Sequence, residues 1–205
     1  MRRTEFIARS FGILLLGLGL AGPAAAQQPF DLGQVTGLLA KNKSGQAKFT
    51  EERHVSGFDG PLRAAGTVSF VAPDRFTRAT TEPRPESMEV QGNLLVLKRG
   101  GRTRQMTVDA IPELMALIEA VRGTLTGNAA VLDRFFKTQV EGNAARWTLT
   151  LVPRDARLAT QVRELKITGL HSDMRSVELW LAGGDRSVMA IDPLQPLAPA
   201  PPAGK

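Results

Sequence analysis

Apolar and polar side chains alternate along three successive segments in the last third of the chain. The alternation runs through residues 147–151, 164–167 and 176–181, and a glycine pair at 183–184 then marks a tight turn before 187–191. Because successive side chains of a β-strand point to opposite faces, each segment predicts a strand with one buried and one solvated face. Such half-buried strands are typical of an antiparallel sheet, whereas the strands of a parallel sheet are apolar on both faces.

The first half of the chain carries weaker signals of the same kind. Alternating segments at 46–55 and 62–70, with a short piece around Phe76, are typical of strands. Two turns that contain glycine flank an apolar run at 94–97, which predicts further hairpin strands on either side of it.

Three segments have the spacing of amphipathic helices instead. Residues 29–42 form the first, with Asp31 in position to cap it. In the second, 112–125, apolar residues recur at intervals of three, four and seven, and Pro112 is placed to open the helix. The third is 129–137, which follows a capping asparagine.

The order of these elements predicts the architecture. A first helix, several meander strands, a helical insertion and more meander strands do not resemble a βαβ series. A single antiparallel sheet of this many strands must curl to bury one face, and the helices are its natural cover. We therefore expect an α+β fold, mainly antiparallel β, in which an open, unclosed half-barrel carries helices as a lid.

The two ends of the chain differ from its middle. Three arginines precede an apolar run that is too short to span a membrane and ends in Ala24-Ala25-Ala26, which predicts a secretory signal peptide at 1–26. The Pro/Ala-rich end predicts a disordered tail at 193–205. The domain is then expected at 27–192. A formal net charge of +6 is too small and too scattered to indicate a nucleic-acid partner.

The residue inventory argues against an enzyme. The chain has no cysteine and two histidines, so thiolate chemistry and a multi-histidine metal site are excluded. His171, Ser172 and Asp173 are adjacent and predict a turn rather than a triad. Glu51 and Glu52 are also adjacent and would face opposite sides of a strand, so they cannot act as a paired acid and base. No catalytic residue, metal or cofactor is expected.

Several motifs together carry a family resemblance. They are Phe49-Thr50-Glu51, Gly66-Thr67-Val68-Ser69-Phe70, Pro73-Asp74-Arg75-Phe76, Pro83, the segment 88–92 and Trp147-Thr148-Leu149-Thr150-Leu151-Val152-Pro153. In this order and spacing the chain resembles the periplasmic outer-membrane lipoprotein carrier family, LolA, over residues 35–191. The resemblance implies helices as a lid over an apolar cavity and the function of a carrier, expected as a monomer. Together with the export signal it implies the periplasm of a Gram-negative bacterium. Such a carrier takes an acylated lipoprotein from an inner-membrane exporter to an outer-membrane acceptor.

Three positions depart from the family pattern. Ala72 stands where members often carry an arginine that holds the lid closed, Arg78 stands in place of an aromatic residue, and Glu51 stands in place of a glutamine. The arginine latch is therefore not carried over. The departures allow another lipidated cargo, such as a glycolipid or a lipid-like pigment.

The candidate lipid-binding residues are the apolar side chains on the predicted strand faces and the central helix. They are Phe49, Val68, Phe70, Phe76, Met88, Val90, Leu114, Met115, Ile118, Trp147, Leu149, Leu151, Leu165 and Ile167. The periodicity shows that these side chains share a buried face and leaves open whether that face is hollow or solidly packed.

Two further alternatives stay open at this stage. The basic group Lys98, Arg99, Arg102 and Arg104 is typical of a solvated hairpin tip, and contact with anionic head groups is the alternative. The facing of Arg75 and Arg78, cavity mouth or outer surface, is equally open. For the whole protein, the alternative function is a periplasmic lipid-sensing or adaptor module that binds a protein partner without net lipid transfer.

Overall fold

The computed structural model describes residues 30–194. The expected signal peptide, 1–26, and most of the expected tail lie outside the described residues. Four α-helices and eleven strands occur within them, in chain order α1 (Leu32–Leu39), β1 (Ser44–His54), β2 (Leu62–Val71), β3 (Arg75–Glu82), β4 (Glu86–Gln91), β5 (Leu94–Arg99), β6 (Arg102–Thr107), α2 (Pro112–Thr126), α3 (Ala129–Phe135), β7 (Phe136–Asn143), β8 (Arg146–Pro153), α4 (Ala156–Ala159), β9 (Val162–Leu170), β10 (Asp173–Leu181) and β11 (Arg186–Pro193). A short 3₁₀ turn at Val108–Ala110 leads into α2.

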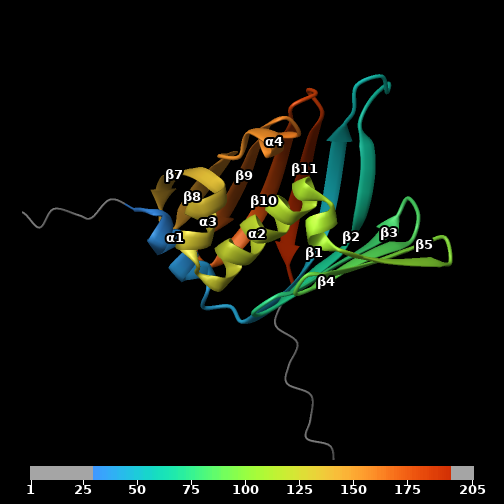
Figure 1. Ribbon diagram of the computed structural model, residues 1–205. Coiled ribbons are helices and arrows are strands. Elements are labelled where there is room, and N and C mark those ends of the chain that lie inside the picture. Colours follow the sequence, from blue (N-terminus) through green and yellow to red (C-terminus); the bar gives the residue numbers. More distant parts are fainter. Residues whose placement is uncertain (1–29, 195–205) are drawn as a thin grey trace, which may run out of the picture.

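All eleven strands belong to one antiparallel sheet. Their order is β6-β5-β4-β3-β2-β1-β11-β10-β9-β8-β7, so the first and last strands of the chain meet at its centre. β6 and β7 are the two edges and do not pair with each other, which leaves the sheet open. The sheet curls around the helices, and α2 crosses its concave side (Figure 1). The predicted unclosed half-barrel with helical cover is confirmed.

Local sequence signals define the helix ends. Asp31 caps α1 through the backbone N–H of Gln34, whose side chain accepts a bond from Asp31 N–H in return. α2 begins at Pro112, as the sequence predicts, and ends at Thr126, where Gly127 caps it with a left-handed φ of 79°. A Cβ at position 127 would lie 2.8 Å from the Ala40 side chain, so this glycine lets α2 end directly against α1.

Two predicted helices have other bounds in the structure. The first, expected at 29–42, is limited to Leu32–Leu39. The sequence predicts a helix over 129–137, but α3 ends at Phe135 and β7 runs from Phe136 to Asn143. β7 is an edge strand that pairs only with β8. Its side chains are mostly polar, so the strand has little apolar alternation, whereas the adjacent Phe135 and Phe136 extend the helical spacing one residue too far.

Buried side chains form two separate clusters on the concave side of the sheet. The first lies under α1, α2 and α3 and contains Val35, Leu39, Ala116, Ala120, Leu132, Phe136, Trp147, Leu149, Leu151, Leu158, Val162, Leu165 and Ile167. The second lies under the start of α2 and contains Val90, Leu95, Val108 and Ile118, with Phe76, Met88, Leu97, Met106, Ile111, Leu114 and Met115 packed against them. α2 is the element that contributes to both.

Trp147 shows how tightly the first cluster is packed. Its ring is 1% exposed, and its indole N–H donates to the His171 carbonyl oxygen at 2.9 Å. A Cβ at position 169, on the neighbouring strand, would overlap the ring, which explains the glycine there. His171 and Ser172 form the turn between β9 and β10, as the sequence predicts.

Candidate apolar binding site

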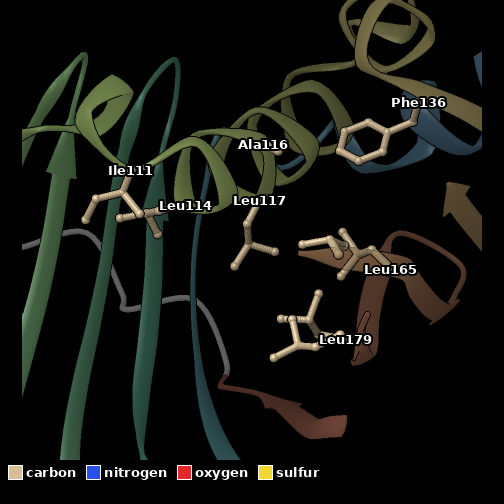
Figure 2. A pocket seen from close by; sticks show the side chains of 9 residues that line it. Ile111, Leu114, Ala116, Leu117, Phe136, Leu165 and Leu179 are labelled. Carbon is tan, nitrogen blue, oxygen red and sulfur yellow. The ribbon is translucent and has the colours of Figure 1, made fainter. Parts of the chain in front are cut away.

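A hollow of about 250 Å³ lies between α2 and the sheet. Figure 2 shows it enclosed by α2 on one side and by strands β9 and β10 on the other. Every side chain that lines it is apolar: Ile111, Leu114, Ala116, Leu117, Phe136, Val162, Leu165, Leu179 and Leu181.

The floor of the hollow follows from strand register. Leu165 of β9 is directly opposite Leu179 of β10, and directly paired residues project from the same face of a sheet. Leu117 extends from α2 toward this floor (Figure 2). Ala116, the smallest lining residue, is 2% exposed. The small Ala116 side chain leaves space that a larger residue would fill.

The two ends of α2 are held differently. Near its C-terminal end, Arg122 donates to the Gly92 carbonyl oxygen at 3.0 Å, and Gly123 lies against Leu132. The N-terminal half packs against the second cluster through Leu114 and Met115, and its Leu114 and Leu117 also border the hollow. Ligand sites usually enclose about 300–1,000 Å³, so the hollow is somewhat smaller than a usual ligand site.

The fourteen sequence-predicted residues all lie on α2 or on the helix-facing side of the sheet, but few border the hollow. Leu114 and Leu165 line it. The others divide among the first cluster (Trp147, Leu149, Leu151, Ile167), the second cluster (Phe76, Met88, Val90, Met115, Ile118) and the centre of the sheet (Phe49, Val68, Phe70).

The sequence prediction omitted seven lining residues, for which some signals existed. Leu179 and Leu181 share the alternating phase of their strand, and Leu117 lies three residues after Leu114 and so widens the helical stripe. The other omitted residues are Ile111, Ala116, Phe136 and Val162. Ala116 carries no signal, because a small residue contributes little to any periodicity.

A polar cluster lies on the same concave face at the centre of the sheet. Glu51 is only 5% exposed, whereas its neighbour Glu52 faces outward and pairs with exposed Arg63 at 3.0 Å. One Glu51 carboxylate oxygen accepts from Ser187 Oγ at 2.6 Å and from Arg53 Nε at 3.2 Å. The other accepts from the guanidinium of Arg78 at 2.5 Å.

Arg78 therefore faces the helix side of the sheet. Its guanidinium carbon stacks over the Phe49 ring, 4.6 Å from the ring centroid. Arg75 is on the opposite face, where it pairs with Glu89 at 3.3 Å. The structure thus separates two arginines whose facing the sequence left open.

The surroundings of Glu51 set its pKa below the usual value. Burial alone would raise the pKa of this carboxyl, but the hydrogen bond from Ser187 and the positive charges of Arg78 and Arg53 outweigh burial and lower it. A carboxyl whose pKa is lower in the folded state stabilises the fold above its unfolded pKa, and this contribution is lost as pH falls through the folded value.

We expect the lowered pKa of Glu51 to make the folded protein less stable in acid. The free energy of unfolding should decline as pH drops below about 4.3, the ordinary glutamate pKa, and Glu51→Gln should flatten that part of the curve. Urea unfolding between pH 3 and pH 7 measures it. Glu52→Gln is the matched control on the outer face, and an equal flattening in that variant would contradict the assignment to Glu51.

Among residues 30–194, no group of three or more histidine or carboxylate side chains could hold a metal ion. In the same part of the chain, no helix combines the length and apolarity needed to cross a membrane.

An open antiparallel half-barrel with helices on its concave face and an apolar hollow beneath one of them is a LolA-like fold. The sequence matches the family described as outer membrane lipoprotein carrier protein LolA-like over residues 24–191. The chain therefore belongs to this LolA-like family, whose members are typically periplasmic carriers rather than enzymes.

Comparison with solved structures finds distant matches to the fold. A LolA superfamily protein, NE2245 from Nitrosomonas europaea, is 11% identical, with 82% of this chain and 93% of that chain covered and a TM-score of 0.42. A DUF1329 family protein from Desulfovibrio piger is 8% identical, with coverage of 83% and 94% and a TM-score of 0.47. The Pseudomonas aeruginosa MucA/MucB complex contains a chain 14% identical, with coverage of 83% and 59% and a TM-score of 0.42. A search of curated proteins gives no match.

Proposed function

We propose that this protein carries acylated cargo, a lipoprotein or a related lipidated molecule, across the periplasm from an inner-membrane exporter to an outer-membrane acceptor. The acyl chains would occupy the hollow between α2 and strands β9 and β10. The observation that carries the proposal is the wholly apolar lining of this hollow, together with membership of the LolA-like family.

The energetics of acyl chains require such a hollow. Each buried methylene contributes about 0.8 kcal/mol, so leaving a C16 chain in water costs about 12 kcal/mol. A soluble carrier must offer comparable apolar surface and still release its cargo. A hollow that closes when empty meets both needs, because the free energy spent on opening the lid subtracts from binding.

The small size of the hollow fits the empty state of such a carrier. At about 250 Å³ it represents the start of a binding site, which would grow as the N-terminal half of α2 moves away. Leu114 and Met115 lie in that half, and the flexible thioether side chain of Met115 can adapt to cargo chains of different shape.

The experiment that tests the proposal is loading and transfer of a defined lipopeptide. Protein purified without detergent is mixed with a synthetic triacylated lipopeptide and examined by native mass spectrometry. We expect a one-to-one complex that gives up the lipopeptide to acceptor liposomes. Failure to form the complex would refute the proposal. A complex that forms without any transfer would favour the lipid-sensing or adaptor alternative.

A further inference from the structure

The polar cluster around Glu51 is continuous with the floor of the hollow. Register places Leu165, Leu179, Ser187 and Arg53 in one row across β9, β10, β11 and β1. Neighbouring strands are about 4.8 Å apart, so the Arg53 backbone lies about 10 Å along the sheet from that of Leu179. A lipid whose tail occupies the hollow can therefore extend its head as far as this cluster.

The cluster carries an excess of positive charge on its accessible side. It combines two guanidinium groups with one carboxylate, and Glu51 is the most buried of the three, with a side chain 6% exposed. The side chains of Arg78 and Arg53 keep 17% and 48% exposure. An incoming group would therefore meet the cations and not the carboxylate.

Arg78 also retains an unused donor. Its Nε is buried and has no hydrogen-bond partner, although buried donors are nearly always paired. Glu86, another carboxylate on this face, forms an ion pair with Arg99 at 3.7 Å and not with Arg78. Arg78 and Arg53 each donate one nitrogen to Glu51, and a guanidinium group carries five N–H donors on three nitrogens, so donors of both arginines remain for another acceptor.

We propose that Arg78 and Arg53 bind an anionic head group, a carboxylate or a phosphate, of the lipid whose acyl part lies in the hollow. This inference rests on the proposed carrier function and predicts that, among acylated cargo, an anionic group near the acyl chains strengthens binding. The planar guanidinium group, with its fork of N–H donors, suits both anions. Glu51 holds the two arginines in place and tempers their attraction, so that the bound anion can leave.

The test compares lipids that differ only in head-group charge. Palmitate, hexadecyl phosphate and methyl palmitate compete with a fluorescent fatty-acid probe for the wild-type protein at pH 8. We expect the two anions to bind about tenfold more tightly than the ester, since one charge-assisted hydrogen bond supplies that much. Inorganic phosphate tests whether the site binds a free anion without an acyl chain. We expect it neither to bind alone nor to displace palmitate.

Two variants should change the preference in opposite directions. Arg78→Gln should reduce the binding of palmitate to that of methyl palmitate. Glu51→Gln removes the competing carboxylate and should strengthen palmitate binding several-fold, with the ester unaffected in both variants. Arg63→Gln, which removes an exposed arginine on the outer face, is the matched control and should behave as wild type. Thermal unfolding monitors the fold of each variant.

The outcomes separate this inference from the proposed function. If all three lipids bind wild type equally, the head-group site is refuted and the carrier function stands. If no lipid binds, the carrier function itself fails. A loss of all three lipids together in Arg78→Gln would show a structural role and would overturn the inference, and so would displacement of palmitate by inorganic phosphate.

Discussion

Fixing α2 to the sheet across the hollow should abolish lipid loading. Leu117 and Leu179 line the hollow from α2 and from β10, and the chain has no cysteine of its own. A Leu117→Cys, Leu179→Cys variant can therefore be joined selectively. Because a disulfide requires Cα atoms about 4.4–6.8 Å apart, a bis-maleimide with a cleavable spacer is the better reagent. We expect lipopeptide loading to disappear on cross-linking and to return partly on cleavage of the spacer.

Two controls isolate the restraint from the chemical modification. The same variant treated with a one-headed maleimide carries both modifications without the bridge, and should load more than the bridged protein. A second pair, Thr50→Cys with Ala65→Cys, joins directly paired residues of β1 and β2 on the outer face and should load normally. Full loading by the Leu117–Leu179 bridged protein would show that α2 does not move and would refute the lid role.

Period-two alternation made the sheet predictable. It locates the later strands because β8, β9 and β10 each bury one face and expose the other, and that pattern is a direct consequence of strand geometry. The start of a helix was equally predictable where a single residue determines it, as Asp31 does for α1 and Pro112 does for α2. β7 was missed because an edge strand needs little apolar surface, so its sequence shows almost no alternation.

The hollow could not be predicted, because periodicity reports which face is buried and says nothing of how completely it is filled. Leu149 and Leu165 have the same pattern in sequence. Leu149 is packed within the first cluster, whereas Leu165 also borders empty space. The difference arises from the way α2 and the sheet meet, since Ala116 of α2 and Leu165 of β9 both border the same empty space. That alignment is a tertiary property of two elements separated by nearly fifty positions.

Two of the departures from the family pattern turn out to be one feature. Glu51 and Arg78 are 27 positions apart and each looks like an isolated mismatch in the sequence. In the structure they form an ion pair at 2.5 Å, and Arg78 covers Phe49 with its guanidinium in the place where an aromatic side chain would pack. The glutamate and the arginine are therefore direct partners, which a single sequence cannot show.

Filling the hollow should stabilise the protein and impair its function. Ala116→Leu adds three carbons to a buried side chain that borders the empty space. Filling an existing cavity typically raises the free energy of unfolding by about 0.5–2 kcal/mol, because new contacts form without displacing old ones. The same carbons occupy the place proposed for cargo, so we expect lipopeptide affinity to fall about tenfold, the equivalent of about 1.4 kcal/mol.

Ala120, one turn further along α2, is the matched control. It is 0% exposed and belongs to the first cluster, but it does not line the hollow. Ala120→Leu should therefore overpack the core and lower the free energy of unfolding by about 1–3 kcal/mol. Urea unfolding should show that the same change, alanine to leucine, raises the free energy of unfolding at position 116 and lowers it at position 120. Lipopeptide titration measures the affinity of both variants. If Ala116→Leu is as destabilised as Ala120→Leu, the space beneath α2 is not available to a ligand. If it is stabilised and still loads fully, the cargo binds elsewhere on the protein.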